Sequence, residues 1–308
     1  MTDNLKKLSA LIEDYNESHG DKLKTEYNEP LSRHTTFRIG GNSDLLVTPQ
    51  TVEALTDLCG MIKETGARAY FLGNGSNVLF DDEGFCGVVV LLTAIRDVTC
   101  LGNVITADAG MSFTALAARA RDCSLTGLEF AYGIPGTVGG AVFMNAGAYN
   151  GEVSFVLKES TYLDLDDLTV HTISLAEHNF GYRDSIYKHT NRLILRASFE
   201  LAPGNKDEIT EVMNDFMNRR VTKQPLEYPS AGSVFKRYPG RFTGQMIDEA
   251  GLKGYTIGGA QVSKKHAGFI INVGGATCAD VRNLIKHIQD VILEKFGCAI
   301  ECEVIYVK

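Results

Sequence analysis

The chain has 308 residues, of which 44% are hydrophobic and 22% charged, and its formal net charge is −8. This length is more than one compact core usually spans, so we expect two domains. The acidic balance argues against a surface specialised for nucleic acids or anionic membranes, although a local basic pocket for a small phosphorylated ligand is compatible with it.

The first part of the chain predicts alternating helices and strands. Residues 1–30 are assigned to an N-terminal helix, because five apolar residues recur there at helical spacing: Leu5, Leu8, Leu11, Ile12 and Tyr15. A second helix is predicted to begin at Thr51–Glu53, and a third has Ser112 as its cap. Strands are predicted at Ala69–Leu72, Gly87–Leu92 and Asn103–Gly110.

The second part predicts further strands, a linker and two helices. Strand-like patterns occupy residues 152–167 and 192–201, and residues 202–208 have the Pro-Gly-Asn composition of a linker. Helices are predicted at about 207–221 and along an apolar face formed by Val281, Leu284, Ile285, Ile288 and Ile292. The chain closes on a predicted strand at 299–307, whose alternation assigns Ile300, Cys302, Val304 and Tyr306 to one face.

The cysteine pattern and the hydropathy indicate a cytoplasmic protein. Seven cysteines, an odd number without any C-x-x-C pair, favour free thiols over a disulfide framework. Cys298 and Cys302 lie four residues apart, but no histidine clusters with them, so we expect no metal site. The N-terminus lacks the apolar stretch of a signal peptide, and no run is long enough to cross a membrane.

A short glycine loop follows the strand predicted at Ala69–Leu72. Glycines let backbone N–H groups approach an anion closely, so we expect this loop to bind a cofactor phosphate through Gly73, Asn74, Gly75, Ser76 and Asn77. A plain turn is the alternative, since glycine, asparagine and serine dominate turns. The loop matches neither the Walker A pattern nor the Rossmann fingerprint.

The run from Gly133 to Glu152 contains six glycines in twenty residues and no charge before Glu152. An apolar glycine-rich wall suits a flat aromatic ring system and, together with the first loop, a dinucleotide. We assign cofactor binding to Gly133, Ile134, Pro135, Gly136, Thr137, Gly139, Gly140, Asn145 and Gly147. The alternative is a packed crossing of strands where only glycine fits.

Six motifs, in order along the chain, resemble the UDP-N-acetylenolpyruvoylglucosamine reductase family. They are "TTFRIGG" (35–41), "GNGSN" (73–77), "GLEFAYGIPGTVGGAVFMNAGAYNGE" (127–152), "FGYRDSIYK" (180–188), "PSAGSVFKR" (229–237) and "KKHAGFIINVGGAT" (264–277). This family comprises flavoenzymes, also called UDP-N-acetylmuramate dehydrogenases, that act in peptidoglycan synthesis and hence in cell wall biogenesis, cell shape and cell division. The resemblance covers roughly residues 31–304.

The resemblance implies an α+β fold in which a two-part FAD-binding lobe of the vanillyl-alcohol oxidase type, residues 31–203, precedes a smaller substrate domain, residues 204–308. It implies noncovalent FAD, NADPH as co-substrate, and UDP-N-acetylglucosamine enolpyruvate as the second small-molecule substrate. No nucleic acid, membrane or metal is expected. The short segment from Phe180 to Phe199 predicts the shorter subtype of the family.

The resemblance also implies three catalytic residues, each of which has an ordinary structural reading. Arg183 faces the enolpyruvyl carboxylate in the family, although an arginine beside a tyrosine is often a surface pair. Ser233 is the proton donor, although a serine in a small-residue turn is usually structural. Glu303 works with Arg183, although strand periodicity alone favours a solvent-facing glutamate. Two more residues are assigned to substrate binding, Tyr182 and Lys236.

Two departures from the family pattern keep other functions open. The family's terminal motif usually reads P-E-V-R, and this chain has Cys302 and Ile305 at the flanking positions. One alternative is a flavin-dependent oxidase of small alcohols or sugars, which would react rapidly with oxygen. Another is a noncatalytic flavin-binding protein, which would bind flavin without turnover.

Overall fold

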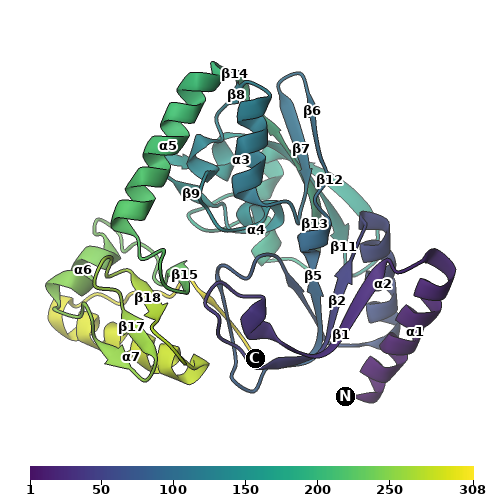
Figure 1. Ribbon diagram of the computed structural model, residues 1–308, viewed down its shortest axis with the longest axis horizontal. Helices are drawn as coiled ribbons and strands as arrows, with labels where there is room; N and C mark the ends of the chain where they lie inside the picture. Colours follow the sequence, from purple (N-terminus) through teal and green to yellow (C-terminus); the bar gives the residue numbers. More distant parts are fainter. The chain divides into compact units, whose positions relative to one another are not determined.

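A computed structural model describes all residues from 1 to 308, and its internal contacts divide the chain into two units (Figure 1). Unit 1 comprises residues 1–27, 44–74 and 86–218, and unit 2 comprises residues 28–43, 75–85 and 219–308. The predicted ranges 31–203 and 204–308 follow the order of the sequence, whereas these contacts group segments that are distant in it.

The first sheet has the strand order β1-β2-β5-β3. Its strands are β1 (Leu23–Pro30), β2 (Asn42–Pro49), β3 (Ala69–Leu72) and β5 (Phe85–Leu91), and β3 runs parallel to β5. In unit 1, helices α1 (Asp3–His19) and α2 (Val52–Thr65) lie side by side next to these strands in Figure 1. Leu5, Leu8 and Ile12 of α1 are fully buried in the shared core, as their spacing predicts.

The N-terminal helix is shorter than the predicted segment 1–30. It ends at His19 because Gly20 adopts a φ of 72°, which is unfavourable for residues with a side chain. Residues Leu23–Pro30 then form β1, whose charged and polar residues are mostly exposed. Such a polar strand carries little of the apolar alternation by which strands are predicted.

The second sheet of unit 1 is antiparallel and has the order β12-β11-β13-β7-β6. Its strands are β6 (Val98–Leu101), β7 (Val104–Asp108), β11 (Leu157–Asp164), β12 (Val170–Ser174) and β13 (Arg192–Glu200). Helices α3 (Phe113–Asp122) and α4 (Val138–Phe143) contribute to the core beside it. Ser112 caps α3 as predicted, because its side chain accepts a hydrogen bond from the Ala115 N–H.

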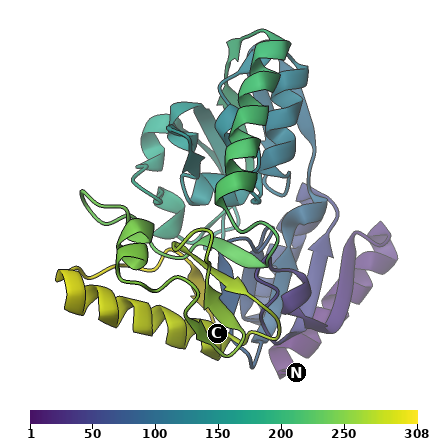
Figure 2. The same cartoon turned by 60° about the vertical axis from the view of Figure 1, so that its left-hand side comes forward.

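The residues predicted as a linker belong to the folded structure of unit 1. Ala202–Pro203 form the short strand β14, which pairs with β8 (Leu125–Thr126). Helix α5 (Lys206–Lys223) follows and lies beside α3 (Figure 2). Its residues Ile209 and Met213 are buried in the core to which α3 also contributes. The turn-like composition was misleading, because it reflects a tight β–α connection rather than a domain boundary.

Unit 2 contains the four-stranded sheet β15-β18-β17-β16. Its strands are β15 (Ser230–Ser233), β16 (Thr256–Ile257), β17 (Ala260–Val262) and β18 (Phe269–Asn272), with helices α6 (Thr243–Glu249) and α7 (Cys278–Phe296). The predicted face of α7 is confirmed, since Val281, Leu284, Ile288 and Ile292 are fully buried. Phe37, Ile39 and Leu79 join the same core, which explains why residues 28–43 and 75–85 belong to this unit.

The predicted closing strand at 299–307 is wrong in its extent. Only β19 (Ile305–Val307) is a regular strand, and it pairs in parallel with β4 (Val78–Phe80). Before it, Cys302 forms an isolated bridge with Phe235. The segment changes pairing partners between these points, so Tyr306 is exposed and Val307 is buried, against the predicted alternation.

The turn between β4 and β5 caps helix α7. The Asp82 carboxylate accepts hydrogen bonds from the N–H groups of Cys278 and Ala279 at 2.6 and 2.9 Å, and Thr277 accepts one from Asp280. These bonds satisfy the first donors of the helix and set a negative charge at its positive end. Asp82 therefore ties residues 75–85 to α7.

Replacing Asp82 with alanine is expected to lower the free energy of unfolding by about 1–2 kcal/mol, since the helix loses both a cap and a favourable charge. The matched control is Glu83→Ala, because the neighbouring Glu83 is exposed and its side chain makes no hydrogen bond. Urea unfolding of the two variants measures the difference. Equal stability of the two variants would show that the cap contributes nothing.

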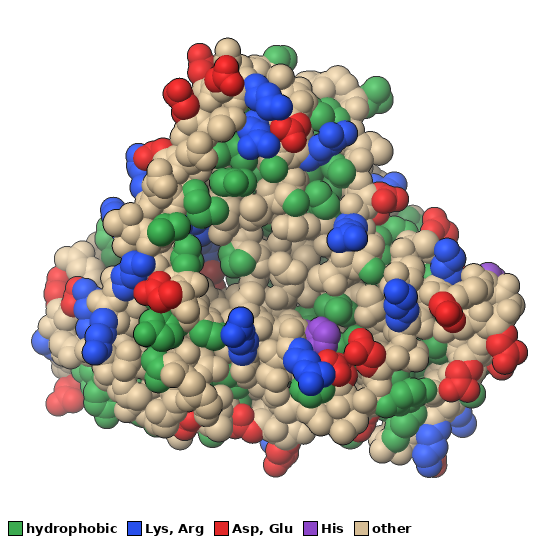
Figure 3. Space-filling view, in the orientation of Figure 1, with side chains coloured by type: hydrophobic (Ala, Val, Ile, Leu, Met, Phe, Trp, Pro, Cys, Tyr) green, Lys and Arg blue, Asp and Glu red, His purple; other side chains and the backbone are tan.

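The visible surface carries mixed charges. Lysine, arginine, aspartate and glutamate side chains are interspersed over the face drawn in Figure 3, and neither sign forms a broad area. None of the helices has both the length and the apolar character that a membrane span requires. The protein contains no group of three or more histidine, cysteine, aspartate or glutamate residues arranged to hold a metal ion.

Candidate functional site

The glycine-rich run in unit 1 begins as a loop held by α3. The hydroxyl of Thr114 accepts a hydrogen bond from the Gly133 N–H at 3.1 Å and donates one to the Ile134 carbonyl at 3.0 Å. Thr137 then caps α4, accepting from the Gly140 N–H at 3.3 Å. The N–H groups of Gly136 and Thr137 have no acceptor within the chain, so two adjacent backbone donors are available to an anion.

The loop after β3 lies against this run. The Asn74 amide donates to the Pro135 carbonyl at 3.2 Å. A Cβ atom at Gly73 would lie 2.5 Å from Thr137 Oγ1, so only glycine permits this approach. The predicted loop is therefore in contact with the predicted run within unit 1.

The remainder of the first loop belongs to unit 2. Gly75 is buried with a φ of 58°, and a Cβ atom there would lie 2.2 Å from the His34 carbonyl oxygen. The hydroxyl of Ser76 makes no hydrogen bond within the chain. The amide of Asn77 donates to the Glu303 carbonyl at 3.1 Å, so this loop also supports a predicted catalytic residue.

Packing within the protein accounts for some glycines of the run. A Cβ atom at Gly139 would lie 2.9 Å from Ala109 Cβ, and one at Gly147 would lie 2.6 Å from the Gly151 carbonyl. At the exposed Gly140 the nearest atom is its own cap, Thr137 Oγ1, at 3.5 Å. The packed-crossing alternative therefore describes Gly139 and Gly147, whereas Gly140 has space beside it.

Asn145 is a structural centre of the segment that follows α4. Its side chain donates to Glu152 and to the Gly181 carbonyl at 3.1 and 3.0 Å, and accepts from the Ser154 N–H at 3.0 Å. The residue is 1% exposed. Its amide is thus committed to protein partners, one of which lies two residues before Arg183.

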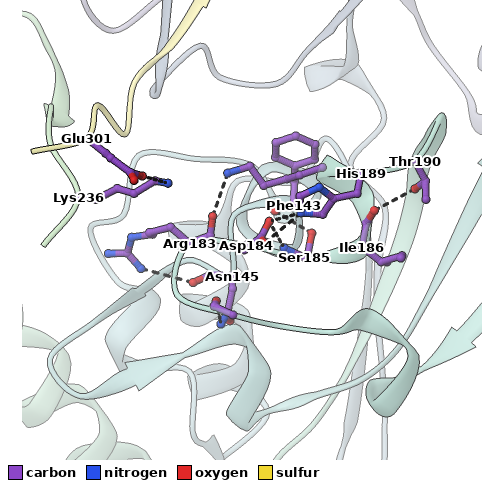
Figure 4. Close-up of polar contacts among 12 residues, drawn as sticks. Phe143, Asn145, Arg183, Asp184, Ser185, Ile186, His189, Thr190, Lys236 and Glu301 are labelled. Carbon is purple, nitrogen blue, oxygen red and sulfur yellow. Dashed lines mark hydrogen bonds and ion pairs between the residues drawn. The ribbon is translucent and has the colours of Figure 1, made fainter. Parts of the chain in front are cut away.

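Arg183 lies in a loop of unit 1 with a backbone φ of 55° (Figure 4). Its guanidinium donates to the Gly147 carbonyl at 3.0 Å and, more weakly, to the Asn145 carbonyl at 3.4 Å. The carbonyl of Arg183 accepts from Lys188 Nζ at 2.9 Å. The exposed Tyr182 has its ring 5.3 Å from the guanidinium carbon. The glycine run and this loop are therefore joined directly.

Ser233 and Glu303 lie on neighbouring backbones in unit 2. The Glu303 N–H donates to the carbonyl of Val234 at 2.7 Å, and Val234 follows Ser233. Ser233 is exposed, and the preceding Gly232 has a φ of 75° with no atom near its missing Cβ. A ligand can thus reach the serine hydroxyl beside the glutamate, as the small-residue turn predicts.

Lys236 forms an ion pair with Glu301 at 2.9 Å, and both residues are partly or largely exposed (Figure 4). The hydrogen bond from Lys236 lowers the pKa of the Glu301 carboxyl. Lys236 lies three residues after Ser233 and its N–H donates to the Glu301 carbonyl. The predicted substrate lysine therefore lies in the segment that follows Ser233, and this segment is hydrogen-bonded to the one that contains Glu303.

Comparisons with known proteins agree with this arrangement. Residues 43–173 match the model of a FAD binding domain, and residues 224–307 match the C-terminal domain of UDP-N-acetylenolpyruvoylglucosamine reductase. A reductase of that name from Caldanaerobacter subterraneus is 47% identical over 91% of this chain and 93% of its own length, and one from Staphylococcus carnosus is 46% identical over 90% of both chains. This chain belongs to the UDP-N-acetylenolpyruvoylglucosamine reductase family. The crystal structure of a family member from Thermus caldophilus is 33% identical, covers 93% of this chain and 99% of its own, and has a TM-score of 0.78.

Membership of the UDP-N-acetylenolpyruvoylglucosamine reductase family confirms the predicted α+β fold class, with its FAD-binding domain and C-terminal domain. It also makes the protein an oxidoreductase and a flavoprotein. The residues of the glycine run fit FAD in this family, because the Gly136 and Thr137 donors and the open space at Gly140 suit an anionic group. The individual roles given to site residues stay predictions.

His266, in a motif shared with the reductase family, has a structural environment. Its Nδ1 accepts a hydrogen bond from the Gly268 N–H at 3.1 Å, and its ring contacts Phe269 edge-on at 5.0 Å. Burial lowers the pKa of this histidine, so the neutral form is favoured. These contacts give His266 a structural role in the fold of unit 2.

Sequence reasoning missed several residues that support the site. Glu152 holds Asn145, and three buried polar residues adjoin the Arg183 loop: Ser160, His178 and Tyr187. The sequence does contain an indication for Ser160, because alternation along β11 places it on the same inward face as Tyr162. A polar residue at an inward strand position indicates a buried network.

Proposed function

We propose that this chain catalyses the NADPH-dependent reduction of UDP-N-acetylglucosamine enolpyruvate to UDP-N-acetylmuramate, a step of peptidoglycan precursor synthesis in the cytoplasm. The observation that carries the proposal is the close relationship to reductases of this name over nine-tenths of the chain. In this proposal the FAD-binding domain holds FAD noncovalently and the C-terminal domain binds the UDP-sugar.

When bound, FAD would supply the hydride chemistry that links NADPH oxidation to reduction of the enolpyruvyl group. The N–H groups of Gly136 and Thr137 are donors suited to its diphosphate. The space beside Gly140 supports close approach of the cofactor to this run. The role of these residues in the proposal is to bind the cofactor and to orient it.

Three residues act on the substrate in this proposal. Arg183, a planar cation, pairs with the enolpyruvyl carboxylate and stabilises the enolate that forms after hydride addition. Glu303 works with Arg183 at this carboxylate. Ser233 donates its hydroxyl proton to the carbon next to the carboxylate, which gives the D-lactyl ether. Its exposure and its neighbour Gly232 support access of the substrate to this hydroxyl.

The test is an anaerobic experiment on the two half-reactions. The purified holoprotein is reduced with NADPH, UDP-N-acetylglucosamine enolpyruvate is added, and the flavin absorption is followed. We expect bleaching by NADPH and return of the oxidised spectrum in proportion to added substrate. A protein that stays bleached contradicts the substrate assignment. Rapid reoxidation by air without the UDP-sugar would instead favour the flavin oxidase.

A further inference from the structure

The loop that carries Arg183 has an unusual backbone. It runs from Asn179 to Ser185, between the short 3₁₀ helices η5 (Leu175–His178) and η6 (Ile186–Lys188). Asn179 and Arg183 both have left-handed φ values, 48° and 55°. Side chains disfavour this region, so the surrounding structure must hold the loop in place.

One buried hydroxyl joins the two ends of this loop. Ser160 Oγ, on strand β11, lies 2.7 Å from His178 Nε2 and 2.5 Å from the Tyr187 hydroxyl. His178 is the last residue before the loop, and Tyr187 is the second residue after it. All three residues are at most 3% exposed. The network belongs entirely to unit 1.

The hydrogen bonds have a definite direction. His178 Nδ1 lies 2.8 Å from the Ser174 carbonyl, which can only accept, so Nδ1 carries the proton. Nε2 therefore accepts from the Ser160 hydroxyl, and Ser160 in turn accepts from the Tyr187 hydroxyl. Burial lowers the pKa of His178 and raises the pKa of Tyr187 to about 12, so both groups stay neutral.

This serine–histidine pair is unsuited to nucleophilic catalysis. A catalytic serine needs an exposed hydroxyl that a substrate can reach, whereas Ser160 is 1% exposed. Its oxygen is also surrounded by two protein partners, the imidazole and the phenol. The Ser160–His178 pair therefore has a structural role, which is to support the adjoining loop.

Other contacts attach the loop to the same frame. The Phe180 ring stacks on the His178 ring at 5.0 Å with an interplanar angle of 13°. Ser185 Oγ donates to the Phe143 carbonyl at 2.8 Å, and the Gly181 carbonyl accepts from Asn145. The His178 and Tyr187 rings also meet edge-on, with their centroids 5.8 Å apart. The Ser160 hydroxyl adds the hydrogen bonds that connect these two residues, and thus the two ends of the loop, to strand β11.

We infer that Ser160 is a positioning residue for Arg183, acting by joining His178 and Tyr187 through one hydroxyl at the base of the loop. The inference rests on the proposed role of Arg183 at the substrate carboxylate. Without the hydroxyl, His178 Nε2 and the Tyr187 O–H lose their common partner in a buried site, and the loop conformation loses its support.

The first test is hydrogen–deuterium exchange on the purified holoprotein. In Ser160→Ala, we expect the amides of residues 179–185 to exchange about ten- to a hundredfold faster than in the wild type. The matched control is Ser198→Ala, on the neighbouring strand β13, whose hydroxyl bonds only to Thr106 at 2.9 Å. The control should leave exchange in this loop unchanged. Unchanged exchange in folded Ser160→Ala overturns the inference.

The second test separates positioning from general damage to the enzyme. In Ser160→Ala, reduction of the flavin by NADPH should keep its rate, whereas reoxidation by UDP-N-acetylglucosamine enolpyruvate should slow about ten- to a hundredfold. An equal fall in both half-reactions overturns the inference. If Ser160→Ala does not fold, Tyr187→Phe removes one bond of the network and should shift exchange and reoxidation in the same direction, by less.

The two proposals fail in distinguishable ways. If the wild-type protein cannot be reoxidised by the UDP-sugar, the proposed function fails, and loop exchange still decides whether Ser160 holds residues 179–185. If the wild type turns over and Ser160→Ala matches it in both loop exchange and reoxidation, the positioning role fails while the function stands.

Discussion

Ser233→Ala is expected to slow the second half-reaction about 10²- to 10⁴-fold, which is the usual contribution of a positioned general acid. Reduction of the flavin by NADPH should continue at its normal rate, because that step needs no proton from the serine. The exposure of Ser233 and the backbone bond from Glu303 to Val234 support this division, since the hydroxyl is accessible and adjoins a second predicted catalytic residue.

Stopped-flow measurement of each half-reaction tests this prediction. Ser230→Ala is the matched control, because Ser230 lies on the same strand and is anchored through its backbone to Thr36. The control should keep both rates. If Ser233→Ala lost flavin reduction as well, or kept a normal second half-reaction, the serine would have a role other than proton donor.

Gly75→Ala is expected to have the largest effect on stability. The φ of 58° alone costs a residue with a side chain about 1–2 kcal/mol. The added Cβ atom would also lie 2.2 Å from the His34 oxygen and 2.8 Å from Thr35 Cα, so the loop must move, at a further cost of about 1–3 kcal/mol. Asn77 would shift with the loop and disturb Glu303, to which it is bonded.

Gly102→Ala is the control that separates the cost of the positive φ from the cost of the close contacts in Gly75→Ala. Gly102 has a nearly identical φ of 60°, and no atom lies within 4 Å of the position of its Cβ. Urea unfolding should show a small loss of stability for Gly102→Ala and a larger one for Gly75→Ala, accompanied by a lower FAD content. Equal losses would mean that the contact with His34 and Thr35 is easily relieved.

The sequence predicted the elements whose signals are local. Apolar spacing identified α1 and α7, and capping residues identified the starts of α2 and α3, because each signal lies within a few residues of its element. The two glycine loops were found because close backbone approach requires glycine whether the neighbour is a ligand or the protein itself. For that reason the sequence could not separate Gly139, which packs on Ala109, from Gly140, which has space beside it.

The features that could not be predicted from the sequence depend on contacts between segments that are distant in the chain. Nothing near Phe37 or Leu79 indicates that they join the core that contains α7, since the α7 residues of this core are about two hundred positions away in the sequence. The closing segment was predicted as one strand because alternation cannot reveal a change of pairing partner between Phe235 and β4. Asn145 was assigned to the cofactor from its motif, and its amide is instead bonded to Glu152, Ser154 and Gly181.

The composition of unit 2 has a consequence for the order in which the protein folds during synthesis. Its core contains Phe37, Ile39 and Leu79, yet all the other residues of this core lie between Ala231 and Val304. Strand β4 can pair with β19 only after β19, which ends at Val307, has left the ribosome. The apolar residues of 28–43 and 75–85 therefore stay uncovered until α7 and β19 have been synthesised, and during this interval the nascent chain exposes apolar surface that favours aggregation and chaperone binding.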